Sequence, residues 1–91
     1  MRRIWKNGGF VTMSKIDVYN EIFREVLFLD DNTNLEELAY KDVEAWDSVG
    51  QMELLALIED RFGIELEPFE FMEFVSYKAG IEILNKHGIE L

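Results

Sequence analysis

An aspartate and a serine directly before a helical pattern are the residues best placed to carry chemistry in this chain. The pair is Asp47 and Ser48, with Val49, Gly50 and Gln51 next in the chain. A serine hydroxyl can be esterified, and the first N–H groups of a helix have no intrahelical acceptor, so this end of a helix favours an anion. The position therefore suits a phosphate ester on Ser48.

The same serine has a purely structural interpretation. Ser48 and Gln51 have the spacing of a capping box, in which the hydroxyl accepts an N–H of the first turn and the glutamine side chain binds back. A serine before an amphipathic helix most often has this role. Under both interpretations, a helix begins at Asp47 or Ser48.

The residues around this pair form a longer pattern. Ala45 and Trp46 precede it, and the helix continues through Met-Glu-Leu-Leu to Ile-Glu-Asp-Arg before Phe62 and Gly63. The pattern resembles the acyl carrier protein family, with Asp-Ser and an aliphatic residue beginning an acidic helix that ends near Phe-Gly. The resemblance extends from the first helix to Leu84, and this combination favours the carrier over the simple cap.

The resemblance implies a covalent cofactor and a set of partners. Ser48 would accept 4'-phosphopantetheine from coenzyme A, and Asp47 would assist recognition and metal positioning by the phosphopantetheinyl transferase. The arm would hold acyl or aminoacyl groups as thioesters, so the protein would be a substrate carrier and not an enzyme, with no catalytic residue and no metal site of its own. The residues expected to dock partner enzymes are Val49, Met52, Glu53, Glu59 and Asp60.

Two positions depart from the usual family pattern. Val49 stands where Leu or Ile is common, and Ala45-Trp46 replaces a glycine-containing context. These departures favour a stand-alone carrier of a specialised pathway or of aminoacyl transfer over the housekeeping fatty-acid carrier.

The charge restricts the partners. The chain has 19 acidic and 9 basic residues and a net charge of -10, with six acids and no base from Asp42 to Asp60. Such a field repels nucleic acid and anionic lipid surfaces and favours proteins with basic patches. With no cysteine, disulfides and cysteine nucleophiles are excluded, and the thiol of the arm would be the only one. We expect a cytoplasmic monomer.

Other candidate sites are weaker. Asp30, Asn32 and Asn34 begin like a calcium-binding loop, but Leu35 replaces the turn glycine and Lys41 the bidentate glutamate, so we expect a polar turn. The single histidine supports no hydrolytic triad. The main alternative function is an unmodified acidic helical adaptor that binds basic partner proteins.

The hydrophobic spacing and end signals predict an all-α fold. We expect a helix over 15–28 begun by Ser14, a long loop over 35–46 with apolar anchors and one helical turn, and a helix from 47 or 48 to Phe62 ended by Gly63. Pro68 begins a short helix through residue 74, and Ser76 caps the last helix. The result is a small four-helix, acyl-carrier-like bundle with three main helices, one short helix and a long first loop.

Three further expectations concern the ends of the chain and the cargo. Gly88 and Ile89 predict a Schellman ending in which Ile89 packs on Leu84. Residues 1–12 carry three basic and no acidic residues and are expected to be a disordered extension upstream of a natural start at Met13, leaving a carrier domain over 13–91. The apolar residues of the short helix could line a cargo cavity, but we expect them to fill the core: Phe69, Phe71, Met72 and Phe74.

Overall fold

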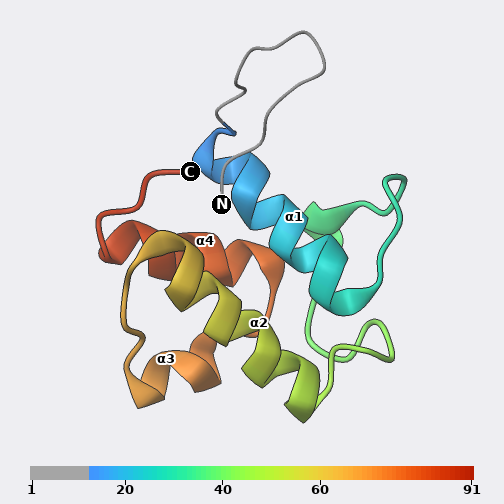
Figure 1. Ribbon diagram of the computed structural model, residues 1–91. Helices are drawn as coiled ribbons and strands as arrows, with labels where there is room; N and C mark the ends of the chain where they lie inside the picture. Colours follow the sequence, from blue (N-terminus) through green and yellow to red (C-terminus); the bar gives the residue numbers. More distant parts are fainter. Residues whose placement is uncertain (1–12) are drawn as a thin grey trace, which may run out of the picture.

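The structure of the protein is a computed structural model that describes residues 13–91; the expected extension over 1–12 lies outside the described residues. The described chain is helical and contains one isolated β-bridge but no strand. The elements in order are α1 (Lys15–Leu27), the 3-10 helix η1 (Leu35–Glu37), α2 (Ser48–Phe62), α3 (Pro68–Glu73) and α4 (Tyr77–Lys86). The predicted small helical bundle with a long first loop is confirmed (Figure 1). None of the described helices has the length and apolar character needed to cross a bilayer.

Local signals in the sequence set most helix ends. The Ser14 hydroxyl accepts the N–H of Asp17 at 3.3 Å. The Ser76 hydroxyl accepts the N–H of Ala79 at 3.0 Å. At the end of α2, Gly63 has φ 67°, a left-handed conformation that glycine adopts without steric strain. These helix ends are where the sequence predicted them.

The last helix ends in the predicted Schellman motif. The N–H of Ile89 donates to the carbonyl of Leu84 at 2.9 Å, and the N–H of Gly88 donates to Asn85 at 3.0 Å. Gly88 has φ 83°, and Ile89 packs against the core that contains Leu84. The motif satisfies two carbonyl groups that the helix itself leaves free.

The core is built around aromatic rings. The Phe23 ring on α1 lies 5.5 Å from Trp46 and 5.3 Å from Tyr77, both edge-on. Its centroid is also 4.9 Å from that of Tyr19 and 6.3 Å from that of Phe74. The cluster joins α1, the loop before α2, and both ends of the α3–α4 connection, so the loop belongs to the core.

The long first loop is pinned to the segment between α3 and α4. Ala39 and Ser76 form an antiparallel bridge. The backbone N–H of Tyr40 donates to the carbonyl of Val75 at 2.9 Å, and the backbone N–H of Tyr77 donates to the carbonyl of Leu38 at 3.0 Å. Leu35 and Leu38 are also buried. The predicted apolar anchoring of the loop is confirmed, and the loop is thereby held immediately before α2.

The expectation that the residues of the short helix fill the core is wrong for two of the four. Phe74 is fully buried and Phe71 is half-buried, but Phe69 is 58% exposed and Met72 is 81% exposed. The reason is the helical period of α3. Phe71 and Phe74 are three positions apart and share the side that packs on the bundle, whereas Phe69 and Met72 share the side that faces solvent.

Candidate functional site

Asp47, and not Ser48, caps the start of α2. The Asp47 backbone is extended, and its Oδ1 accepts the N–H of Gly50 at 2.9 Å. Ser48 is the first helical residue and its side chain is exposed. The interpretation of Ser48 and Gln51 as a capping box is therefore wrong, because the preceding carboxylate already supplies the capping acceptor.

The side chain of Gln51 has a different role, which the sequence did not indicate. Its Oε1 accepts the indole N–H of Trp46 at 2.6 Å. Its Nε2 donates to the carbonyls of Phe71 at 3.0 Å and Phe74 at 2.9 Å. Gln51 thus ties the loop before Ser48 to the C-terminal end of α3. The only sequence signal for this contact is Trp46 itself, because a buried indole N–H requires an acceptor.

Tyr40 is a second neighbour of the site that the sequence analysis missed. Its hydroxyl lies 3.4 Å from Oγ of Ser48, which is long for a bond between two hydroxyl groups. Its ring meets Trp46 edge-on with the centroids 6.2 Å apart. A turn of the loop between Tyr40 and Trp46 brings Tyr40 back beside Ser48. In this turn Lys41 has φ 77°, and its backbone N–H donates to the carbonyl of Trp46 at 3.1 Å.

Gly50 allows the loop to approach the first turn of α2 closely. A Cβ atom at this position would overlap the backbone carbonyl of Ala45. Because that atom belongs to the backbone, the overlap could not be relieved by a side-chain rotation. The small residue at position 50 therefore fixes the loop against the helix that presents Ser48.

The predicted docking residues are not equivalent in the structure. Val49 and Met52 are large apolar side chains that face solvent, and Glu53 and Asp60 are exposed. Glu59 is half-buried, and its Oε2 accepts the N–H of Leu66 at 2.7 Å. Its carboxylate therefore also holds the chain that follows α2.

The side chain of the single histidine contacts a buried carboxylate. Nε2 of His87 lies 2.9 and 3.0 Å from the two carboxylate oxygens of Glu70 on α3, and Glu70 is 5% exposed. Burial alone would raise the pKa of the Glu70 carboxyl. The hydrogen bonds from Glu67 and His87, together with the electrostatic effects of His87 and Lys86, outweigh burial, so this pKa lies below its ordinary value.

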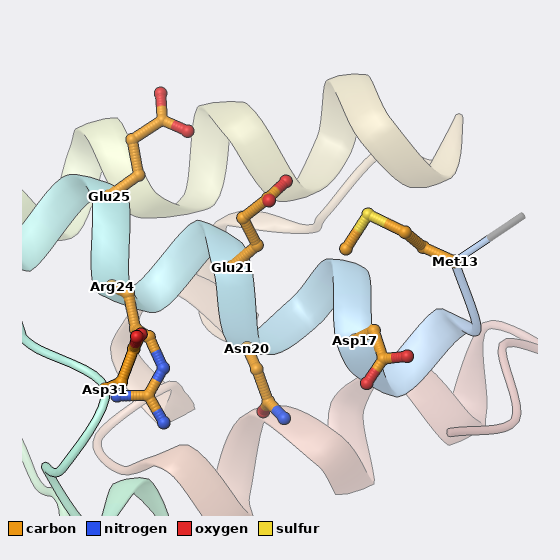
Figure 2. A pocket seen from close by; sticks show the side chains of 7 residues that line it. All are labelled: Met13, Asp17, Asn20, Glu21, Arg24, Glu25 and Asp31. Atoms are coloured by element: carbon orange, nitrogen blue, oxygen red, sulfur yellow. The ribbon is translucent and has the colours of Figure 1, made fainter. Parts of the chain in front are cut away.

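A surface pocket follows α1 and is lined mainly by polar and charged residues (Figure 2). It has a volume of about 530 Å³, and seven residues line it: Met13, Asp17, Asn20, Glu21, Arg24, Glu25 and Asp31. The second pocket, of about 420 Å³, lies between α1 and α2. Ser48 lines neither of these two pockets, and its side chain is exposed at the start of α2.

The calcium-like segment is organised as a turn. Oδ1 of Asp30 accepts the N–H of Asn32 and the hydroxyl of Thr33, each at 3.0 Å. The Asn34 side chain accepts the N–H of Glu36 and so caps η1. Within residues 13–91, no group of three or more histidine, cysteine or acidic side chains is arranged to hold a metal ion.

Comparisons with known proteins add no relative to this description. No family model, no curated protein and no solved structure matches the chain. The assignment of a function therefore depends on the residues around Ser48, their hydrogen bonds and their exposure.

Proposed function

We propose that the protein is a carrier in which Ser48 is esterified by 4'-phosphopantetheine. The main support for the proposal is that Asp47 and Ser48 have different roles at the start of α2. Asp47 caps the helix, which leaves the Ser48 hydroxyl exposed and free of capping. A serine that served only as a cap would have its hydroxyl bound to the first turn.

The surroundings of Ser48 fit a phosphodiester. The N–H groups of Ser48 and Val49 belong to the first turn and have no intrahelical acceptor, so they are available to an anion. The Tyr40 hydroxyl, 3.4 Å from Oγ, is a further donor within reach of a group attached there. The neighbouring Asp47 carboxylate is engaged by Gly50, which reduces its repulsion of a second negative charge.

Attachment requires one displacement at phosphorus. Oγ of Ser48 forms a bond to the phosphorus that bears the pantetheine of coenzyme A, the pyrophosphate bond breaks, and adenosine 3',5'-bisphosphate leaves. A base of the transferase takes the hydroxyl proton. Once attached, the arm supplies a thiol on which acyl or aminoacyl groups are held as thioesters. The protein then contributes presentation and docking, because a tethered substrate reaches a docked enzyme at high effective concentration.

The exposed side of α2 supports docking next to the attachment point. Val49 and Met52 are 67% and 66% exposed, so partners can bury apolar surface there. Glu53 and Asp60 add negative charge on the same helix. A partner with a basic patch around an apolar centre fits this arrangement, and its encounter would be steered by the charge of the domain.

The decisive experiment is intact mass spectrometry after incubation with coenzyme A and a broad-specificity phosphopantetheinyl transferase. We expect the parent protein to gain one phosphopantetheinyl group and Ser48→Ala to gain none. Ser14→Ala is the matched control, because Ser14 is also an exposed serine at a helix start, and it should be modified like the parent.

The same experiment separates the carrier from an unmodified adaptor. The adaptor would use the exposed Val49 and Met52 and the nearby acids without any attached arm. If the folded parent protein is not modified while a reference carrier in the same reaction is, the carrier proposal is refuted. Partner binding that Ser48→Ala leaves unchanged would then support the adaptor.

A further inference from the structure

Phe28, at the end of α1, combines two unfavourable features. Its backbone has φ 58° and ψ 45°, a left-handed conformation that favours glycine over a residue with a Cβ atom. Its side chain is 86% exposed. The corresponding positions after α2 and α4 are occupied by Gly63 and Gly88. The Phe28 side chain therefore buries little surface against the described chain, and a binding partner could contact it.

Phe28 forms one wall of the pocket between α1 and α2. The pocket has a volume of about 420 Å³ and most of its exposed lining is apolar; we call it the α1–α2 groove, and its lining residues are Glu25, Val26, Phe28, Glu53, Ala56 and Leu57. α1 and α2 run side by side in opposite directions (Figure 1). The groove therefore lies where the end of α1 meets the middle turns of α2.

Acidic side chains stand on both sides of the α1–α2 groove. Glu25 contributes from α1, where it also lies 3.8 Å from Arg61. Glu53 contributes from α2, and its side chain makes no hydrogen bond or ion pair to another described residue. An apolar floor between carboxylates matches a segment that carries apolar side chains on one face and Lys or Arg beside them.

We propose that the α1–α2 groove binds a cationic amphipathic helix of a partner protein. An apolar side chain of that helix would pack between Phe28 and Leu57, and a basic residue would lie at Glu53. Because Glu53 is also one of the exposed acids of α2, the groove extends the docking surface beside Ser48 toward α1. The proposal does not require Ser48 to be modified.

The test uses a short helical peptide of leucine and lysine as the probe, titrated into the full chain and followed by the amide NMR spectrum. We expect the largest shifts at residues 25–28 and 53–57. Phe28→Asn should weaken binding about tenfold, as expected for an aromatic anchor. Asparagine tolerates the left-handed conformation, so the melting temperature of this variant should stay the same or rise.

Two matched variants distinguish binding in the α1–α2 groove from a general electrostatic attraction between the acidic protein and the basic peptide. Phe69→Ala removes another exposed aromatic ring, on α3, and should leave the affinity within about twofold of the parent. Glu53→Gln should weaken binding about threefold at low salt and less at high salt, because salt screens exposed charges.

Several results would overturn the proposal. They are an unchanged affinity of Phe28→Asn, shifts centred on α3, or a parent protein whose mass in solution rises with concentration through self-association at the groove. Because the peptide titration uses unmodified protein, failure of the groove leaves the result of the Ser48 mass experiment standing, and the reverse is also true.

Discussion

At the scale of single residues, the adjacent side chains of Asp47 and Ser48 have different contacts at the start of α2. Asp47 accepts the N–H of Gly50 at 2.9 Å, while the only hydrogen-bond partner of the Ser48 side chain among the described residues is the Tyr40 hydroxyl, at 3.4 Å. A carboxylate is the stronger acceptor at a helix N-terminus because it also interacts favourably with the helix dipole. Modification of Ser48 would thus leave the cap intact.

This assignment predicts unequal stability effects of two substitutions. Asp47→Ala removes the cap and should lower the free energy of unfolding by about 1 kcal/mol. Ser48→Ala should change it by less than about 0.5 kcal/mol, since an exposed hydroxyl is lost. Urea denaturation of the three proteins measures both effects. Asp47→Asn, which keeps a capping acceptor, is the control, and a larger loss in Ser48→Ala than in Asp47→Ala would show that the serine is the cap.

At the scale of elements, Gln51 connects three segments that meet beside Ser48. It accepts the indole N–H of Trp46 in the loop and donates to Phe71 and Phe74 at the end of α3. The six-residue α3 is too short to be stable by itself. Its position next to the candidate site therefore depends on contacts of this kind.

Removal of the Gln51 side chain should loosen α3. Gln51→Ala leaves an indole N–H and two carbonyls without their partner, and we expect a loss of about 2 kcal/mol in the free energy of unfolding. Amide hydrogen exchange should become faster in α3 while it stays slow at the centre of α1. Gln51→Glu is the informative control, because it keeps the acceptor for Trp46 but has no N–H groups for α3. Unchanged exchange in α3 for both variants would contradict this role.

At the scale of the whole molecule, the contact between the side chains of Glu70 and His87 links α3 to the end of α4. Its two contacts of 2.9 and 3.0 Å bring a buried carboxylate together with a residue 17 positions further along the chain. Glu70 also accepts the N–H of Glu67 at 2.8 Å, so it holds the start of α3 as well. Protonation of Glu70 would weaken both connections.

The lowered pKa of Glu70 gives the stability of the fold a predictable dependence on pH. A carboxyl whose pKa is lower in the folded state than in the unfolded state contributes stability that is fully present above the unfolded value, about 4.5 here, and that is lost as the pH falls through the folded value. Glu70→Gln should therefore be less stable than the parent near neutral pH, and this difference should shrink below about pH 4.5. Urea midpoints measured across this range check the prediction.

The control for this titration is Glu73→Gln, which changes an exposed carboxylate on the same helix. It should follow the acid dependence of the parent. A difference between Glu70→Gln and the parent that stays constant from neutral pH to pH 3 would mean that the Glu70 carboxyl is not stabilised in its charged form.

The sequence by itself determined the helical architecture, because its signals act over a few residues. Ser14 and Ser76 cap helices through bonds to residues three positions on, and Gly63 and Gly88 end them through their own backbone conformations. Apolar spacing likewise located the main helices to within about a residue. The residue types and the pattern around Asp47 and Ser48 also identified this pair as the candidate site.

Only the tertiary structure decided which groups meet at that site and which face solvent. Gln51 contacts carbonyls 20 and 23 positions away, and Tyr40 reaches Ser48 only because the loop turns back at Lys41. The exposure of Phe69 likewise depends on how α3 lies on the bundle. Such contacts depend on the packing of segments that are distant in the chain, and local sequence patterns do not specify which distant groups meet.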